Sequence, residues 1–429
     1  MSKKSASAGT DVAKEFSKVC IMTPDMQVFR TLHVAHNKLE DFEKLFVLLD
    51  QVKEDFGCST TVVLEATGHY HKILLRALVK RDIKAVVINP IQSDSIRNLN
   101  IRKVKNDKVD AKKLAALFHI KEGDFQIVTQ VDTEIDALKD LVRQYYAYQD
   151  EITVHKLRLS SFVDRVMLGY DKILPLTSVS GLAVLKAYPN PKALLRARKS
   201  TLLRLLSESS RKGPTWALEK YEGLIALAAI MIKLGEPGLH LAEMIRREIA
   251  QIEYIHGLCD QIAADIKALI AESRRSDASD LAQTIDLLDS IPGISILAAA
   301  TLIGEFGDLD AFCSAQAMTA YAGIDPSVNQ SGKFKGNRVR ISKRGSRFLR
   351  RVLFFIASAN IRKLRNGTYA NPPIKDFYER KCQSKPKMVA LVAVMHKMIY
   401  IIFAVMRDRK PFELRDPKAH AAALMGKVA

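Results

Sequence analysis

Residues 60–65 read Thr-Thr-Val-Val-Leu-Glu, an apolar run that ends on a carboxylate. A short run rich in β-branched residues predicts a buried strand. A Thr-Gly turn and a helical stretch over Tyr70–Lys80 follow this run. Ala85-Val-Val-Ile88 then gives a second strand signal, which Asn89-Pro90 stops. Strand, helix and strand in this order predict a parallel βαβ unit.

The residues before this unit predict an antiparallel hairpin and a helix. Lys18–Met22 and Gln27–Leu32 have strand-like patterns and are joined by Thr23-Pro24-Asp25, a turn sequence. Residues 38–54 carry apolar positions at a helical period. Antiparallel strands followed by strand, helix and strand are the order of an RNase H-like domain. We expect this α/β domain over residues 1–125.

Four acidic residues lie where strands and one helix of this domain should end: Asp11, Glu65, Asp107 and Asp110. The last two are three residues apart in the run KVKNDKVDAKK, so they would face the same side of a helix. Four carboxylates brought together repel one another unless positive charge lies between them. Divalent metal ions with oxygen ligands are the usual solution, and a metal pair can act on a phosphodiester. The quartet therefore predicts a site for Mg²⁺, with Mn²⁺ as an alternative.

Lysines surround the two aspartates. Lys105, Lys108 and Lys112 would hold a phosphate backbone next to the metal ions. The alternative interpretation is an exposed helix face whose acidic and basic residues form salt bridges, which is a common pattern.

The whole composition favours a polyanionic partner. The chain has 429 residues, with 66 Lys and Arg against 47 Asp and Glu, a net charge of +19. Nucleic acid is the most frequent partner of so basic a protein, and a basic protein without such a partner is the alternative. This length predicts two or three domains.

Cysteine usage and hydropathy indicate a cytoplasmic protein. The five cysteines are scattered and form no CxxC pair, which argues against a zinc knuckle or a disulfide scaffold. The N-terminus has no apolar core of a signal peptide. Residues 388–406 are nearly all apolar, but His396 and Lys397 interrupt them, so we expect a buried helix rather than a membrane span. No membrane partner is expected.

Residues 126–280 predict a helical region. Glu134–Asp164 reads as one long helix. His240–Ser273 reads as a second, with apolar residues spaced close to a heptad repeat. This seam predicts a coiled-coil arm and fits both packing within one chain and dimerisation.

Residues 281–410 predict a mostly helical domain, followed by a tail over residues 411–429. Ile291-Pro-Gly-Ile294 lies between two helical runs and is typical of a helix–hairpin–helix turn. In such a turn the backbone N–H groups around Gly293 would face a phosphate. A short helical connection without a ligand has the same pattern.

From Ser331 to Arg365 the chain has twelve Lys and Arg residues and no acidic residue. A solvated helix face normally mixes both signs, so this depletion favours a nucleic-acid surface. Glycines at positions 332, 336 and 345 would let the backbone lie close to a phosphate chain. The basic residues are Lys333, Lys335, Arg338, Arg340, Lys343, Arg344, Arg347, Arg350, Arg351, Arg362, Lys363 and Arg365.

Ser331 opens this basic stretch, in Asn329-Gln-Ser-Gly332. A serine near guanidinium groups can attack phosphorus, because the cations offset the charge on the transferring group. The alternative is a turn serine beside a glycine.

Several of these runs together resemble a known family. VVLEATGHYH, VINP, KVKNDKVDAKKLA, IPGISILAAATLIGEFGD, AYAGIDPSVNQSGKFKG and RISKRGSRFLRRVLF are similar to runs in the transposases of the insertion-sequence one-ten family, described as bridge-RNA-guided recombinases. The resemblance extends from about residue 11 to about residue 406.

The resemblance implies more than the residues do by themselves. It implies a RuvC-like domain with a DEDD metal site at Asp11, Glu65, Asp107 and Asp110, a coiled-coil arm, and a transposase domain in which Ser331 forms a phosphoserine intermediate. It also implies donor and target DNA, a noncoding guide (bridge) RNA, and a tetramer built as a dimer of dimers. The cell location would be the cytoplasm, at the nucleoid.

One departure from the family pattern concerns Asp11. The family usually has an apolar strand running into Gly-x-Asp, whereas residues 5–10 here read Ser-Ala-Ser-Ala-Gly-Thr. We therefore expect a weak strand before Asp11.

Two other functions remain alternatives to an RNA-guided transposase. One is a RuvC-like junction nuclease that hydrolyses DNA with water and metal. The other is a nucleic-acid-binding protein without catalysis.

Overall fold

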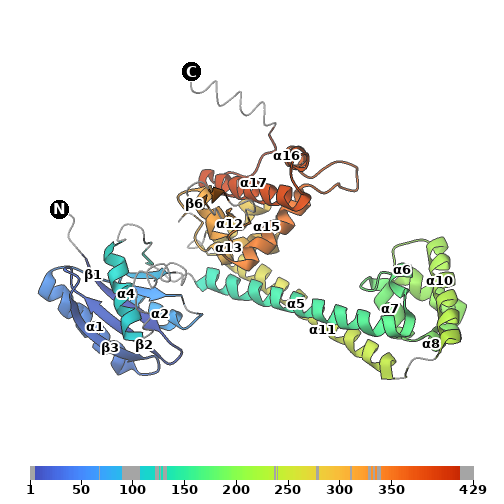
Figure 1. Ribbon diagram of the computed structural model, residues 1–429, viewed down its shortest axis with the longest axis horizontal. Helices are drawn as coiled ribbons and strands as arrows, with labels where there is room; N and C mark the ends of the chain where they lie inside the picture. The colour runs from blue at the N-terminus through green and yellow to red at the C-terminus, as the bar shows by residue number, and fades with distance from the viewer. Residues whose placement is uncertain are drawn as a thin grey trace, which may run out of the picture. The chain divides into compact units, whose positions relative to one another are not determined.

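The computed structural model describes residues 5–66, 68–88, 107–120, 125, 127–128, 133–235, 238, 240–276, 280–309, 312–326, 330–331, 334–335 and 340–415. Only the backbone is described at residues 107–109, 330–331 and 334–335. The chain divides into two compact units, Met1–Thr133 and Glu134–Ala429 (Figure 1).

The first unit is built on a mixed sheet of five strands. The strands are β1 (Ala6–Val12), β2 (Phe16–Met22), β3 (Val28–Ala35), β4 (Thr60–Glu65) and β5 (Ala85–Ile88). Their order is β3-β2-β1-β4-β5, with β1 antiparallel to β2 and parallel to β4. This sheet confirms the predicted α/β domain at the N-terminus.

Helices cover both faces of the sheet. Helices α1 (Leu39–Phe56) and α2 (His71–Val79) pack on the face that carries Ala6, Ala8 and Val12 of β1. Helix α4 (Asp107–Ile120) packs on the opposite face, where its Leu114, Leu117 and Phe118 meet Val63, Val86 and Ile88. Because successive residues of a strand point to opposite faces, Glu65 lies on the same face as Val63, toward α4.

Strand β1 has small side chains because α4 lies directly on its backbone. A Cβ atom on Gly9 would overlap the backbone of Ala111 and Ala115. Two residues earlier, the Ser7 hydroxyl donates a hydrogen bond to the Ala115 carbonyl at 2.9 Å and lies 3.0 Å from His119 Nε2. The prediction of a weak strand before Asp11 was wrong, since β1 is paired on both sides and buried. Its stability comes from ladder hydrogen bonds and close helix packing rather than from large apolar side chains.

The second unit is mostly helical. Its first part contains α5 (Thr133–Met167), α6 (Tyr170–Ile173), α7 (Val179–Ala187), α8 (Pro191–Arg196), α9 (Lys199–Glu208), α10 (Pro214–Leu234) and α11 (His240–Ser273). Its second part contains α12 (Leu281–Asp289), α13 (Ile296–Phe306), α14 (Ala315–Tyr321), β6 (Gln330–Ser331), β7 (Phe334–Lys335), α15 (Arg347–Asn360), α16 (Pro372–Cys382) and α17 (Lys387–Asp408).

The two long helices α5 and α11 lie antiparallel and share two hydrophobic cores (Figure 1). The first half of α5 and the last third of α11 pack with α12–α17, and their other ends pack with α6–α10. Polar contacts also join them: Gln149 Nε2 donates to Cys259 Sγ at 3.4 Å, and His155 Nδ1 lies 2.6 Å from a Glu248 oxygen. Both long helices were predicted, and α11 buries its apolar seam within its own chain.

Helix α17 is the one helix among the described residues that is long and apolar enough to cross a membrane by composition. Its Met395, Met398 and Ile402 are buried in the same core as α13 and α15. This packing agrees with the predicted buried helix. Residues 416–429 of the predicted tail lie outside the described residues.

The contact at Gly9 generates a stability prediction. Gly9→Ala should destabilise the first unit by about 2–3 kcal/mol, because overpacking forces the backbone of α4 to move. Urea denaturation with exchange of the α4 amides measures both effects.

Gly257→Ala is the matched control. Gly257 lies inside α11 with open space around its Cα. Alanine there should stabilise the protein by up to about 1 kcal/mol. Equal effects of the two substitutions would contradict the packing argument.

Candidate functional site

The backbone brings Asp11 and Glu65 to the same end of neighbouring strands. Thr10 of β1 lies opposite Leu64 of β4 in a parallel register, so Asp11 and Glu65 are the next positions along. On the other side of β1, Asp11 is paired with Lys18 of β2. Glu65 is buried, with 3% of its surface exposed, and Asp11 is half-buried.

Helix α4 brings the other two acids toward this end of the sheet. Ser7 meets residues 115 and 119 of α4, and Gly9 meets residues 111 and 115. Moving two residues forward along β1 thus moves the contact one turn back toward the N-terminus of α4. The next such move goes from Gly9 to Asp11, and it places Asp11 beside the first turn of α4. That turn begins at Asp107 and includes Asp110, which is 9% exposed and lies 3.7 Å from Lys113 Nζ.

Asp11, Glu65 and Asp110 thus lie toward one end of the sheet, but these three described side chains do not form a ligand set. The described side chains, which do not include Asp107, contain no group of three or more His, Cys, Asp or Glu that could hold one metal ion. The donor chemistry fits a hard divalent cation, since every member is a carboxylate. Of the neighbouring lysines, Lys112 is exposed, while Lys105 and the side chain of Lys108 lie outside the described residues.

In the second unit, Ser331 lies in a short antiparallel ladder. Gln330 and Ser331 of β6 pair with Lys335 and Phe334 of β7. Further down, Pro326 bridges Ile341, the Ser342 amide donates to the Asp325 carbonyl at 2.8 Å, and the Lys343 amide donates to the Gly323 carbonyl at 2.9 Å. We call the described segments of this ladder, residues 323–326, 330–331, 334–335 and 340–343, the serine hairpin. The side chain of Ser331 lies outside the described residues.

The predicted basic residues around the serine hairpin fall into three groups. Arg340, Lys343, Arg344 and Arg347 are exposed, as are Arg362, Lys363 and Arg365. Lys333 and Arg338 lie outside the described residues, as does the side chain of Lys335. Arg350 and Arg351 are half-buried and bond to the protein itself. Arg351 pairs with Asp150 at 2.7 Å and stacks on the Tyr146 ring, while Arg350 binds backbone carbonyls.

Gly293 lies in the turn between α12 and α13, as predicted, and packing gives a reason for glycine there. Its φ of 80° is in the left-handed region. A Cβ atom would also come within 2.8 Å of Asn360 Nδ2, which donates to the Pro292 carbonyl at 2.7 Å. The turn is thus fixed against the end of α15.

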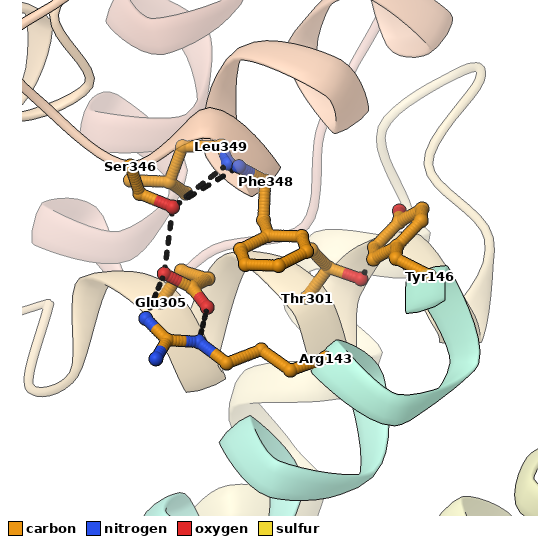
Figure 2. A network of polar contacts seen from close by, with 7 residues as sticks. All are labelled: Arg143, Tyr146, Thr301, Glu305, Ser346, Phe348 and Leu349. Atoms are coloured by element: carbon orange, nitrogen blue, oxygen red, sulfur yellow. Dashed lines mark hydrogen bonds and ion pairs between the residues drawn. The ribbon is translucent and has the colours of Figure 1, made fainter. Parts of the chain in front are cut away.

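A buried carboxylate ties three helices together near the start of α15 (Figure 2). Glu305 of α13, 2% exposed, accepts hydrogen bonds from Arg143 Nε at 2.5 Å and Nη2 at 3.1 Å. It also accepts one from the Ser346 hydroxyl at 2.7 Å. Ser346 is the N-cap of α15, and its oxygen accepts from the amides of Phe348 and Leu349. The Arg143 guanidinium lies over the Phe348 ring.

The charge of Glu305 is maintained by this network. Burial by itself would raise the pKa of Glu305, but the hydrogen bonds from Arg143 and Ser346 and the charge of Arg143 hold the pKa below its usual range. The hydrogen bonds to Glu305 and the negative charge of Glu305 raise the pKa of Arg143. The ion pair of Arg143 with Glu305 therefore joins α5 to α13. The hydrogen bond from Ser346 to Glu305 joins α13 to the beginning of α15.

Sequence reasoning did not single out Gly9, Arg143, Glu305 or Ser346. A glycine inside a strand and a charged residue in the apolar run ILAAATLIGEF were visible signals. Ser346 precedes a helical run, which is the pattern of an N-cap. The ion pair of Arg143 with Glu305 joins residues 162 positions apart, and no local sequence pattern predicts it.

Comparison with known proteins finds two family models that match different stretches of the chain. The family model of the DEDD transposases of IS110, described as "Transposase", matches residues 8–168. A second model, described as "Transposase IS116/IS110/IS902 family", matches residues 285–379. The chain belongs to the IS110 family of transposases.

The chain spans about half or less of the length of the two curated relatives described here. An uncharacterized 43.6 kDa protein of insertion element IS110 from Streptomyces coelicolor is 24% identical over 54% of this chain and 53% of its own. The pilin gene-inverting protein of Moraxella bovis is 33% identical over 32% of this chain and 41% of its own. Among solved structures, T. thermophilus RuvC in complex with a Holliday junction substrate matches 29% of this chain and 99% of its own, with 12% identity and a TM-score of 0.22.

The Glu305 network predicts a pH-dependent contribution to stability. Glu305→Gln should lower the free energy of unfolding at pH 7 by about 1–3 kcal/mol, less than for a fully buried pair because Arg143 is 46% exposed. The pKa of Glu305 is lowered by folding, so its contribution is present at neutral pH and is lost as pH falls through the folded pKa. The difference between variant and wild type should therefore shrink in acid, as measured by urea denaturation across pH.

Glu253→Gln is the control. Glu253 pairs with Lys186 in the same unit, with both side chains about half exposed. Its loss should cost about 0.5 kcal/mol or less. A Glu305→Gln effect as small as this would argue against the network as a structural lock.

Proposed function

We propose that the chain is a DNA transposase and recombinase of an insertion sequence, which cleaves and rejoins DNA strands through a phosphoserine intermediate at Ser331. The observation that carries the proposal is the placement of Asp11, Glu65 and the first turn of α4 at one end of the sheet. It occurs in a chain whose two parts match transposase family models.

Asp11, Glu65, Asp107 and Asp110 would hold Mg²⁺, with Mn²⁺ as an alternative. Bound there, the metal would supply Lewis-acid stabilisation of charge on a phosphodiester. The chain itself contributes the fixed position of the donors, because the close packing of α4 on Gly9 sets the distance between helix and sheet. Lys112, and with it Lys105 and Lys108, would bind the phosphates of the same strand.

Ser331 would act as the nucleophile. Its Oγ would form a bond to phosphorus while the phosphorus–oxygen bond to one deoxyribose breaks, leaving the sugar hydroxyl as the leaving group. Attack by a hydroxyl of another DNA strand would reverse the step and release the serine. Exposed cations that follow the serine hairpin, such as Arg344 and Arg347, would offset charge on the phosphoryl group.

Nucleic-acid contacts by Gly293, Arg340, Lys343, Arg344 and Arg347 would position the backbone rather than read bases. The turn at Gly293 would then serve as a helix–hairpin–helix contact. Lys333, Lys335 and Arg338 belong to the same proposed basic stretch. Arg350 and Arg351 were predicted with it, but both bond to the protein itself. Sequence choice would come from pairing of donor and target DNA with a noncoding bridge RNA.

The assembly would be a dimer of dimers in the cytoplasm, at the nucleoid. Residues 1–125 would be the RuvC-like domain, residues 126–280 a coiled-coil arm, residues 281–410 the serine-bearing domain, and residues 411–429 a tail.

A metal-dependent nuclease that uses water is the second candidate. The order of the five strands and the burial of Glu65 and Asp110 favour it, because the acids of such a sheet can act without a serine.

Substitution of the serine separates the two candidates. The protein is incubated with the end DNA of its element, the flanking RNA and Mg²⁺, and covalent protein–DNA product is measured on denaturing gels. The wild type should form an adduct that Ser331→Ala loses entirely, because the alanine has no oxygen to bond phosphorus. Strand cleavage without any adduct in the wild type would overturn the serine mechanism and favour the nuclease.

Substitution of Asp110 tests the acidic site. Asp110→Asn should slow Mg²⁺-dependent cleavage about 10²-fold or more, because an amide is a poorer metal ligand than a carboxylate. DNA affinity should change less than about threefold, since no positive charge is lost. Asp265→Asn, on the exposed side of α11, is the control with the same charge change. Equal rates in the two variants would contradict a metal role for Asp110.

A further inference from the structure

The base of the serine hairpin is closed backbone against backbone. Gly323 has a φ of 66°, and a Cβ atom there would overlap the Gly345 amide. A Cβ atom on Gly345 would overlap the Tyr321 carbonyl. The backbone segments at the base of the serine hairpin therefore touch at two positions where only glycine fits. Just above, the Ser342 hydroxyl bonds to the Asp325 carboxylate.

One guanidinium nitrogen joins both sides of this base. Arg350 Nη1 donates to the Gly345 carbonyl at 2.7 Å and to the Ala322 carbonyl at 3.3 Å. Ala322 directly precedes the first segment of the serine hairpin, and Gly345 lies two residues after its last segment. Arg350 lies in the first turn of α15, which Ser346 caps and Glu305 holds. The base of the serine hairpin is thus linked to the buried network of Figure 2.

A second side chain supports the same base from another helix. His396 Nε2, on α17, donates a hydrogen bond to the Ile324 carbonyl at 2.8 Å. Ile324 is fully buried. His396 and Lys397 interrupt the apolar run of α17, and this contact gives a reason for a polar residue at position 396.

We propose that Arg350 is a positioning residue, which fixes the base of the serine hairpin and thereby the direction in which Ser331 is presented. The proposal rests on the proposed function of Ser331. It gives Arg350 a role distinct from the phosphate contacts of Arg347, which is exposed on the same helix. A charged donor that bridges two carbonyls contributes more than a neutral one, and a group displaced by 1 Å can lose much of its rate.

The first test measures the stem directly. Hydrogen exchange of the Ser342 and Lys343 amides, which close the stem, should accelerate about tenfold or more in Arg350→Ala, because local opening becomes easier. Arg350→Lys should show a smaller acceleration, since lysine keeps the charge without the planar donor geometry. Arg347→Ala should leave exchange unchanged. Unchanged stem exchange in Arg350→Ala would overturn the proposal.

The second test separates positioning from nucleic-acid binding. At saturating DNA, Arg350→Ala should form adduct about 10- to 100-fold more slowly, with DNA affinity within about twofold of wild type. Arg347→Ala should instead weaken affinity. His396→Ala, which removes no positive charge in the basic stretch, should slow adduct formation in the same direction as Arg350→Ala. Loss of affinity in Arg350→Ala with normal exchange would make Arg350 a phosphate contact and contradict the proposal.

These outcomes are distinguishable from failure of the serine mechanism. If the wild type forms no adduct, the proposed function fails, while hydrogen exchange still decides whether Arg350 fixes the stem. If Arg350→Ala does not fold, hydrogen exchange and the rate of adduct formation are measured on the milder Arg350→Lys variant. Normal exchange and normal adduct rate in that variant, together with a normal His396→Ala, would overturn the proposal.

Discussion

The close approach of α4 to β1 is the constraint on which the first unit depends. A helix backbone can lie this near a strand only where the strand has no side chain, and Gly9 provides that place. The approach fixes the height of α4 above the sheet and its register along β1. Asp11 lies two residues after Gly9 on β1, and Asp110 lies one residue before Ala111 on α4, so the same packing determines where these two acidic residues lie along the two elements.

The second unit depends in a comparable way on the ionised Glu305. Burying a carboxylate is costly unless charge and hydrogen bonds compensate, and Arg143 and Ser346 supply both. The compensation links the long helix α5 to the N-terminus of α15. Arg350 extends the link by one more step, to the backbone that begins and ends the serine hairpin. A series of polar contacts therefore runs from Arg143 of α5 to the base of the serine hairpin.

Local patterns were sufficient for most of the elements. The apolar runs at 60–65 and 85–88 formed strands, and the helical periods at 134–164 and 240–273 formed α5 and α11. The strand before Asp11 was mispredicted as weak, because side-chain propensity does not register a helix backbone lying on a strand. Arg350 and Arg351 were predicted from charge alone, and charge does not distinguish a phosphate contact from a bond to the protein's own carbonyls.

The sequence by itself determined the fold class, the helical middle region, the positions of the acids at element ends and the family to which the chain belongs. These features depend on periodicity and on short motifs, which are local in the chain. Only the tertiary structure decided that α4 packs on Gly9, that Glu305 pairs with Arg143, and that Arg350 closes the serine hairpin. Each of the first two contacts joins residues more than a hundred positions apart, and the third depends on how a hairpin closes on the next helix. Such partnerships follow from the packed arrangement of the elements, because no local pattern specifies them.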